Sequence, residues 1–267
     1  MKQYILTRKL LLLFGIYKIY EYLLFSEIRK GPIPKHVGVI LDGNRRWARA
    51  KGVKKEIAYS EGAKKVENIV NWCDELGVKS LTIFVLSTEN YLKRDRSEIE
   101  IIFNLLKKYL TKLVRESERN KKQMNIKFIG NLSLLEDEEL LHLIQDIERI
   151  YNFDGGITIN IAFLYGGKWD IINAAKKIAK EVKEGRLNPE DINIESFQRY
   201  LSTSHMDHQD IDLILRTGGE SRLSNFLLWQ AAYSELVFLD VFWPDFRKID
   251  FLRAVRIYQK RTRRFGA

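Results

Sequence analysis

The stretches that decide the fold are HVGVILDGNRRWARAKG at residues 36–52 and IDLILRTGGESRLSNFLLWQ at residues 211–230. Each reads as a short apolar strand that ends abruptly in a loop of glycine, arginine and hydrogen-bonding residues. Ligands of open α/β sheets bind beyond the carboxyl ends of the strands, so we expect the two loops to meet at one edge of a sheet. Their arginines suit phosphate groups, and Asp42 offers a carboxylate that can hold a hard divalent cation of the Mg²⁺ type.

Outward from these stretches, short apolar runs alternate with longer helical patterns. We expect strands at residues 36–41, 80–86, 125–129, 157–163, 211–215 and 236–239, and helices near 60–76, 96–118, 136–150, 168–184 and 194–201, with a basic helix from residue 251. Near-continuous apolar strands are typical of a sheet covered on both faces, and the alternation favours right-handed βαβ units. The sequence therefore predicts an α/β fold: a single domain with a central, mostly parallel six-stranded sheet flanked by helices.

A parallel sheet makes a specific prediction about the polar loops. The segments Asp42–Arg46, Ser87–Lys93, Tyr165–Trp169 and Arg216–Asn225 each follow an expected strand, so all four should emerge on the same edge and line one cleft.

Composition limits the classes of partner. The 267 residues include 45 Lys and Arg against 35 Asp and Glu, a formal charge of +10, which favours nucleic acid, anionic lipid or phosphorylated metabolites without choosing among them. A single cysteine, Cys73, excludes an internal disulfide and a thiolate zinc cluster, and suits the cytoplasm.

Residues 1–33 form an apolar and basic extension that precedes the domain expected over residues 34–267. Lys18 and Glu21 interrupt its apolar run, which is shorter than the roughly 20 residues that span a bilayer, and no signal-peptide cleavage site follows. Two readings stay open: a helix that lies on the membrane surface, giving peripheral contact, or a helix packed on the domain.

The loops differ in how specifically their sequences indicate a function. DGNRRW alone is also an ordinary turn, but RTGGESR places Arg216 and Arg222 around a glycine pair, which strengthens the phosphate reading of both loops. Ser224 and Asn225 are expected at the start of a helix, where free N–H groups favour an anion. In the third loop, Asn90 either passes a proton through a hydrogen-bonded network or caps a helix.

Several chemistries lose their support. The chain has no G-x-x-x-x-G-K-[ST], no G-x-G-x-x-G and no DDxxD, which argues against P-loop hydrolysis, dinucleotide binding and the helical trans-type prenyl synthases. His205 and His208 lack cysteine partners, so a metal role is disfavoured, and His36 is expected to be structural. RNA binding by the basic tail would leave the strand-end loops unexplained, and no nucleic-acid partner is expected.

Long motifs in a fixed order give the chain a specific resemblance. HVGVILDGNRRWA, GAKKVENIV, LSTEN, INIAFLYGGKWDI and RTGGESRLSNFLLWQAAYSELVF followed by WPDF resemble the cis-prenyltransferase family, which includes undecaprenyl and dehydrodolichyl diphosphate synthases. The resemblance runs from about Pro34 to Gly266, and GPIPKH and STENYLKR are closer to dolichol-type and archaeal-like members.

The resemblance implies an Mg²⁺-dependent homodimeric enzyme whose fold encloses a hydrophobic tunnel. Its members condense isopentenyl diphosphate sequentially onto an allylic primer, farnesyl or geranylgeranyl diphosphate, to make a polyprenyl diphosphate. We expect a medium-length product, a precursor of a glycosyl carrier lipid, with Ile157 near the far end of the tunnel. The alternative is a non-catalytic, membrane-associated partner subunit of a prenyltransferase.

By the same resemblance, Asp42 and Asn90 are catalytic, Asp42 and Glu235 hold the metal, and Arg264-Phe265-Gly266 reaches the partner's site. Substrate binding would fall to Gly43, Asn44, Arg45, Arg46, Trp47, Lys55, Tyr59, Ser87, Thr88, Glu89, Tyr91, Lys93, Arg216, Arg222, Leu223 and Ser224. The chain departs from many bacterial members at Lys55, Tyr59, Lys93 and Ser221, where arginine or histidine is common. Lysine keeps the charge there but loses the bidentate geometry.

Overall fold

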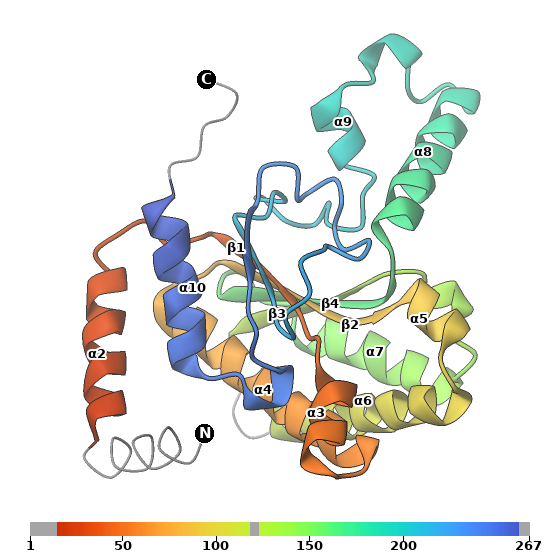
Figure 1. Ribbon diagram of the computed structural model, residues 1–267. Coiled ribbons are helices and arrows are strands. Elements are labelled where there is room, and N and C mark those ends of the chain that lie inside the picture. Colours follow the sequence, from red (N-terminus) through yellow and green to blue (C-terminus); the bar gives the residue numbers. More distant parts are fainter. Residues whose placement is uncertain (1–14, 118–122, 262–267) are drawn as a thin grey trace.

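The computed structural model describes residues 15–117 and 123–261, which form one six-stranded sheet with helices around it (Figure 1). The strands are β1 (His36–Ile40), β2 (Ser80–Ser87), β3 (Met124–Ile129), β4 (Ile157–Tyr165), β5 (Leu213–Arg216) and β6 (Glu235–Phe238). Every neighbouring pair is parallel, and the order across the sheet is β3-β4-β2-β1-β5-β6. The predicted fold class is confirmed, and the two stretches that decide it, β1 and β5, are direct neighbours.

The sheet separates two apolar layers. The larger layer lies under α4 (Lys55–Leu76), α6 (Arg96–Ser117) and α7 (Glu138–Ile150), which cover one face in Figure 1. The smaller layer lies on the opposite face, where Phe226 stacks on Phe84 with ring centroids 4.8 Å apart. Burial on both faces explains why β1 is apolar along its whole length apart from His36 and Gly38.

His36 is a structural residue, as predicted. Its Nε2 lies 2.7 Å from the hydroxyl of Thr82, and Nδ1 lies 3.1 Å from the carbonyl oxygen of Gln209. Burial lowers the pKa of His36 to about 4, so the ring is neutral at pH 7. His205 is likewise engaged, because its Nε2 lies 2.8 Å from the side-chain oxygen of Asn160.

The described part of the N-terminal extension is the helix α2 (Ile16–Ile28), which lies alongside α10 (Lys248–Lys260) (Figure 1). Leu24 and Ile28 are buried in the same core as the sheet, so one face of α2 is packed. On its other face Ile19, Tyr22 and Leu23 are exposed by 59%, 71% and 59%. Within residues 15–117 and 123–261, no helix is both long enough and apolar enough to cross a membrane.

The remaining helices are α3 (Asn44–Lys51), α5 (Thr88–Lys93), α8 (Gly167–Lys183) and α9 (Ile194–Gln198), with 3₁₀ turns at Leu132–Leu134, Pro189–Asp191 and Trp243–Asp245. Two of these helices were predicted as loops. Asn44 begins α3 directly after Gly43, and the Ser87 hydroxyl caps α5 by accepting a hydrogen bond from the Asn90 backbone N–H at 3.0 Å. The capping residue of this loop is therefore Ser87, not the side chain of Asn90.

The helix expected after Ser224 does not form, so that prediction was wrong. Residues 223–234 form a series of turns, and Ser224, Asn225 and Leu227 have φ of 52°, 65° and 40°. A right-handed helix cannot accommodate three left-handed residues. The anion site inferred from a helix N-terminus at Ser224 is thereby lost, and its place is taken by the side chains described below.

Candidate active site

The four polar loops do meet at one edge of the sheet, as predicted, and Asn225 connects three of them. Its side-chain amide donates to Glu89 Oε1 at 2.6 Å, and its side-chain oxygen accepts from the Lys168 N–H at 2.9 Å. The Asn225 backbone carbonyl accepts from the Gly167 N–H at 2.7 Å. One residue thus ties the loop after β5 to the loop after β2 and to the start of α8.

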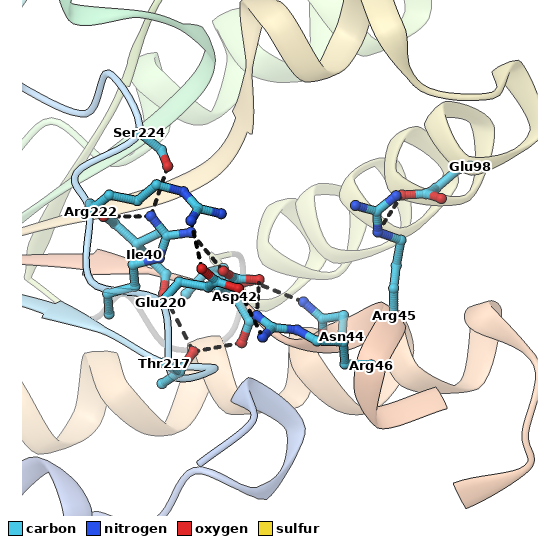
Figure 2. A network of polar contacts seen from close by, with 12 residues as sticks. Ile40, Asp42, Asn44, Arg45, Arg46, Glu98, Thr217, Glu220, Arg222 and Ser224 are labelled. Carbon is cyan, nitrogen blue, oxygen red and sulfur yellow. Dashed lines mark hydrogen bonds and ion pairs between the residues drawn. The ribbon is translucent and has the colours of Figure 1, made fainter. Parts of the chain in front are cut away.

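The fourth loop carries Asp42, which is fixed through both its backbone and its side chain. The Asp42 carbonyl accepts hydrogen bonds from the Thr217 hydroxyl at 2.7 Å and from the Trp243 N–H at 3.1 Å. Its carboxylate accepts from Arg216 Nη2 at 2.7 Å and pairs with Arg46 Nη2 at 3.1 Å. Figure 2 shows Arg46 and Thr217 converging on Asp42 from two different segments.

The pKa of Asp42 reports the outcome of two opposing effects. Partial burial raises it, but the hydrogen bonds and charges of Arg216 and Arg46 outweigh burial, so the pKa lies below its ordinary value. Asp42 is therefore ionised at neutral pH and available as an oxygen ligand.

Two glycines allow this close packing. Gly43 has φ of 105°, and a Cβ atom there would lie 2.8 Å from the Phe242 ring. Gly218 has φ of 89°, and a Cβ atom there would lie 2.7 Å from Arg46 Nη2. Both positions need the left-handed conformation and the missing side chain of glycine. As a result, the first N–H groups of α3 open beside Asp42, a favourable place for an anion.

A second layer of charge surrounds the loop after β5. Arg216 Nη1 donates to the Ser224 hydroxyl at 2.7 Å, so the Arg216 fork bridges Asp42 and Ser224. Glu220 pairs with Arg222 at 2.6 Å and with Arg46 at 3.3 Å (Figure 2). Sequence reasoning did not assign Glu220 a role, although it lies inside the RTGGESR motif.

A separate cationic group gathers around Glu98, whose side chain is only 2% exposed. Its carboxylate accepts from Lys55 Nζ at 2.9 Å and from the Tyr59 hydroxyl at 2.7 Å, and it pairs with Arg94 at 3.0 Å and Arg45 at 4.0 Å. Burial raises the pKa of Glu98, but these partners outweigh burial and lower it overall. Glu98 thus positions three cations and a phenol; the sequence analysis overlooked it.

These groups surround the mouth of a cavity of about 1360 Å³. Beyond the mouth, the lining becomes apolar and comes from α4, α6 and the sheet: Val66, Val70, Ile83, Val85, Ile102, Leu105, Leu106, Leu110, Leu113, Met124, Ile126, Ile159 and Ile161. A charged mouth with an apolar interior suits an amphiphile that has an anionic head and a hydrocarbon tail.

Comparison with known proteins decides the family. A family model described as "Putative undecaprenyl diphosphate synthase" matches residues 40–266. The chain belongs to the cis-prenyltransferase family. This cis-prenyltransferase is similar to the tritrans,polycis-undecaprenyl-diphosphate synthase (geranylgeranyl-diphosphate specific) of Thermoplasma acidophilum, with 42% identity over 93% of this chain and 95% of that protein.

A second relative with the same description, from Sulfurisphaera tokodaii, is 44% identical over 96% of this chain and 97% of that protein. Among solved structures, lavandulyl diphosphate synthase from Lavandula x intermedia in complex with dimethylallyl diphosphate superposes with a TM-score of 0.84 at 35% identity, covering 88% of this chain and 99% of that one. A probable undecaprenyl diphosphate synthase from Campylobacter jejuni superposes with a TM-score of 0.71 at 33% identity, covering 88% of this chain and 100% of that one. The predicted family is confirmed, and so is its likeness to archaeal members.

Most of the predicted site residues of this cis-prenyltransferase line the cavity: Asp42, Gly43, Asn44, Arg45, Arg46, Lys55, Tyr59, Ser87, Glu89, Asn90, Arg216, Arg222 and Ser224. Six others, among them Glu235, lie outside its lining. The Trp47 ring lies under the Lys51 ammonium, and the Thr88 hydroxyl donates to the Leu164 carbonyl. Tyr91 stacks on Phe103. Leu223 packs in the smaller apolar layer, and Lys93 is exposed.

Arg94, rather than Lys93, delivers the basic side chain of the third loop to the cavity. Its side chain is 19% exposed, and its Nε is buried without a hydrogen-bond partner among the described residues. The same holds for Arg216 Nε and Asn44 Oδ1. Polar atoms buried in this way are costly unless a ligand satisfies them, so they fit a site for an anionic head group.

Glu235 does not meet Asp42 within the chain. It begins β6 and pairs with Leu213 at the amino end of β5, whereas Asp42 follows the carboxyl end of β1. Glu235 lies beside Leu213, and Arg216 is three residues further along β5, which corresponds to roughly 10 Å along the strand at 3.3 Å per residue. The Glu235 carboxylate instead accepts from Arg261 Nη1 at 2.8 Å. Within one chain, Asp42 and Glu235 thus lie toward opposite ends of the strands, and the role of Glu235 at the metal stays a prediction.

The predicted chain-length residue Ile157 also lies outside the main cavity. It is 4% exposed and lines a neighbouring cavity of about 320 Å³, which shares Val70 and Met124 with the large one. Its effect on product length stays a prediction. The tail Arg264-Phe265-Gly266 lies outside the described residues.

The contacts of Glu98 allow a test of whether this residue positions the cations around it. We expect Glu98→Gln to raise KM for the diphosphate substrates about tenfold while kcat changes less, because Lys55, Arg94 and Arg45 lose their common anchor. The pKa of Glu98 is lower in the folded protein than its ordinary value of 4.5, so its ionised form stabilises the fold. This contribution to the free energy of unfolding is fully present above pH 4.5 and is lost as the pH falls through the lower pKa of the folded state. The free energies of unfolding of the unaltered protein and of Glu98→Gln, measured with denaturant, should therefore differ at pH 7 and become equal as the pH falls below 4.5.

Glu100→Gln is the matched control, since Glu100 lies on the same helix but is 66% exposed. Equal effects of the two substitutions on KM would show that Glu98 does not position the cations.

Proposed function

We propose that this cis-prenyltransferase extends geranylgeranyl diphosphate with successive isopentenyl diphosphate units to an undecaprenyl-length product. The observation that carries the proposal is the ionised Asp42, held by Arg46 and Arg216, at the mouth of an apolar cavity of about 1360 Å³. The primer and the length are supported by the two archaeal relatives, which are described as geranylgeranyl-diphosphate specific undecaprenyl synthases.

Two groups of cations suit two diphosphates. One group comprises Arg46, Arg216 and Arg222 around Asp42, and the other comprises Lys55 and Arg94 around Glu98. Both line the same cavity mouth, so two anionic heads can be held close together. Holding two reactants in register can supply roughly 7–11 kcal/mol of the barrier.

The reaction breaks the allylic carbon–oxygen bond, and diphosphate leaves with the electron pair. The double bond of isopentenyl diphosphate attacks the allylic carbon, and one proton is lost as the cis double bond forms. The arginines stabilise the charge that develops on the departing diphosphate. Asn90 lines the mouth with an exposed side chain, and in this proposal it passes the proton into the hydrogen-bonded network around the diphosphates.

The residues present fit a Mg²⁺ ion that is held mainly by its substrate. Within residues 15–117 and 123–261, no group of three or more His, Cys, Asp or Glu could hold a metal alone. Mg²⁺ often uses one or two carboxylates together with substrate phosphates and water, and here Asp42 would supply the carboxylate. When bound, the ion would neutralise charge on the departing diphosphate.

The alternative reading, a non-catalytic partner subunit, is not favoured by this geometry. Asp42, Arg46, Arg216 and Arg222 all line one mouth, and their contacts hold them in a single arrangement.

We further propose that the enzyme is a homodimer. Two exposed isoleucines support this, Ile172 on α8 at 57% and Ile194 on α9 at 64%, because large exposed apolar side chains favour an interface. A dimer also offers the one way in which Glu235 can join Asp42, since the two are apart within a chain.

Peripheral membrane contact is the third element of the proposal. Ile19, Tyr22 and Leu23 on the open face of α2 form an exposed apolar row, and the Arg253 guanidinium of α10 lies 5.6 Å from the nearby Tyr20 ring. Apolar side chains beside cations are typical of helices that bind anionic membrane surfaces.

The activity is tested with labelled isopentenyl diphosphate, Mg²⁺ and either primer, followed by separation of the products by length. We expect geranylgeranyl diphosphate to be used more efficiently than farnesyl diphosphate, with an eleven-unit main product as in the relatives' description. Asp42→Asn should lower kcat at least about 100-fold with an unchanged circular dichroism spectrum, because the loop carboxylate binds metal and arginines rather than core. Asp245→Asn, an exposed aspartate elsewhere, is the control.

An active Asp42→Asn enzyme would refute the role of the carboxylate. Absence of any elongation by the unaltered enzyme with both primers would favour the partner-subunit reading instead.

The dimer is tested by light scattering of the full chain. We expect a mass of twice 31.5 kDa, and we expect Ile172→Glu with Ile194→Glu to shift the population toward 31.5 kDa, since charges are unfavourable in an apolar interface. A single-chain mass for the unaltered protein would exclude the homodimer.

Membrane contact is tested by co-sedimentation with vesicles that contain phosphatidylglycerol. Replacing Ile19, Tyr22 and Leu23 by serine should weaken binding at least about tenfold, since each buried apolar side chain contributes about 1.5–3 kcal/mol. Leu92→Ser, at a leucine that is 69% exposed on α5, should leave binding unchanged. Equal binding of all three proteins would contradict the assignment to α2.

A further inference from the structure

The loop after β5 and the first turn of α5 are joined at one point of the cavity mouth. Asn225 and Glu89 both line the cavity, and the Asn225 side-chain amide donates to Glu89 Oε1 at 2.6 Å. Ser224 directly precedes Asn225, and Asn90 directly follows Glu89. The hydrogen bond therefore connects the chain neighbours of two predicted site residues that lie on different loops.

Asn225 is held in an unusual backbone conformation. Ser224 and Asn225 have φ of 52° and 65°, and two consecutive non-glycine residues in the left-handed region are unfavourable unless their surroundings hold them there. The Asn225 backbone carbonyl accepts from the Gly167 N–H at 2.7 Å, and its side-chain oxygen accepts from the Lys168 N–H at 2.9 Å. These two bonds fix Asn225 on the start of α8, so its side-chain amide is directed at α5.

Gly166 leaves the space that this contact occupies. A Cβ atom on Gly166 would lie 2.8 Å from Asn225 Nδ2 and 3.8 Å from Glu89 Oε1. The φ of Gly166 is −157°, which any residue can adopt, so glycine is required here for its small size. Three loops thus converge on the hydrogen bond and leave no room for a further side chain.

On the other side of the bond, the first turn of α5 is fixed by its own side chains. The Ser87 hydroxyl accepts from the Asn90 N–H at 3.0 Å, and the Thr88 hydroxyl donates to a carbonyl oxygen of β4 at 2.8 Å. Successive residues of a helix lie about 100° apart around its axis. The Glu89 carboxylate, held by Asn225, is a third fixed point, and the direction of the adjacent Asn90 side chain follows from it.

We propose that Asn225 and Glu89 form a bridge that positions Asn90 relative to the diphosphate site of the loop after β5. Both are then positioning residues, and Glu89 acts through Asn90 rather than on a substrate. The inference rests on the proposed function, because it uses the roles given there to the arginines and to Asn90.

The bridge completes a path of direct contacts across the mouth. Arg216 donates to Asp42 at 2.7 Å and to the Ser224 hydroxyl at 2.7 Å. The peptide bond from Ser224 to Asn225 and the hydrogen bond from Asn225 to Glu89 continue this path to α5. The group that holds a diphosphate and the group that moves a proton thus keep a fixed separation, and small errors in such a separation lower the rate steeply.

Exchange of the two polar groups tests the bridge. Asn225→Asp removes the donor and places a carboxylate opposite Glu89, so kcat should fall at least about tenfold while the KM of both substrates changes less. Glu89→Gln keeps an acceptor for Asn225 and should lower kcat only about threefold, because a charge-assisted hydrogen bond becomes a neutral one. In Asn225→Asp with Glu89→Gln, the new amide donates to the new carboxylate, so kcat should return to within about threefold of the unaltered enzyme.

The exchange leaves the other contacts of Asn225 in place. Aspartate has the same shape, is compatible with the left-handed conformation, and keeps an oxygen that accepts from the Lys168 N–H. The matched control is Asn188→Asp, which makes the same charge change at an exposed asparagine outside the cavity and should leave kcat unchanged.

Three kinetic outcomes would contradict the bridge. A double variant as slow as Asn225→Asp would do so, because independent roles give additive losses. A kcat for Glu89→Gln as low as that of Asn225→Asp would show that the carboxylate acts on the reactants itself. An equal loss in Asn188→Asp would assign the effect to net charge. If the unaltered enzyme extends neither primer, the proposed function is refuted and the bridge with it.

Denaturant unfolding of the same proteins gives a readout that does not depend on activity. The unfolding midpoint should fall for Asn225→Asp and return in the double variant, because the hydrogen bond is restored. Equal midpoints for all variants would overturn the bridge and leave the proposed function intact. A midpoint that returns while kcat stays low would show that the bond stabilises the loops without positioning Asn90.

Discussion

The contact between Asp42 and Arg216 is the constraint on which the site depends. Ile40 and Arg216 are register partners in neighbouring parallel strands, so the chain leaves both strands at the same level. Arg216 is only 5% exposed, and a buried guanidinium is unfavourable without a charged or hydrogen-bonding partner. The Asp42 carboxylate satisfies it at 2.7 Å, and the pair fixes two loops that are 174 residues apart in the chain. Arg46 and Ser224 then attach to this pair, and Glu220 attaches to Arg46.

Much of this arrangement follows from the sequence, because strand-end loops in a parallel sheet have only one edge to occupy. The apolar runs and the glycine-rich loops therefore predicted both the sheet and the meeting of the loops that carry Asp42 and Arg216. Glu98 was overlooked for a physical reason. Glutamates at the start of a helix are usually solvated, and only tertiary contact brings Lys55 and Tyr59 to Glu98. Lys93 and Arg94 are adjacent cations, and sequence cannot tell which of the two turns inward.

The helix predicted after Ser224 failed because backbone conformation overrode the sequence pattern. FLLWQAAY has the apolar content of a helix, but the left-handed residues at Ser224, Asn225 and Leu227 direct the chain through turns that let Asn225 reach two other loops. The family resemblance placed Glu235 in the metal site with Asp42, and that assignment stays a prediction. The register of β5 with β6 puts Glu235 at the opposite edge.

The cations of the mouth share a smaller number of carboxylates, because Arg46 lies between Asp42 and Glu220, Arg222 pairs with Glu220, and Lys55 and Arg94 share Glu98. A diphosphate that binds at the mouth would therefore compete with these carboxylates for the same cations. These carboxylates are therefore expected to lower the affinity of the mouth for a diphosphate. We expect the same competition to assist the release of inorganic diphosphate after each addition, because the carboxylates can pair with the arginines again as the by-product leaves.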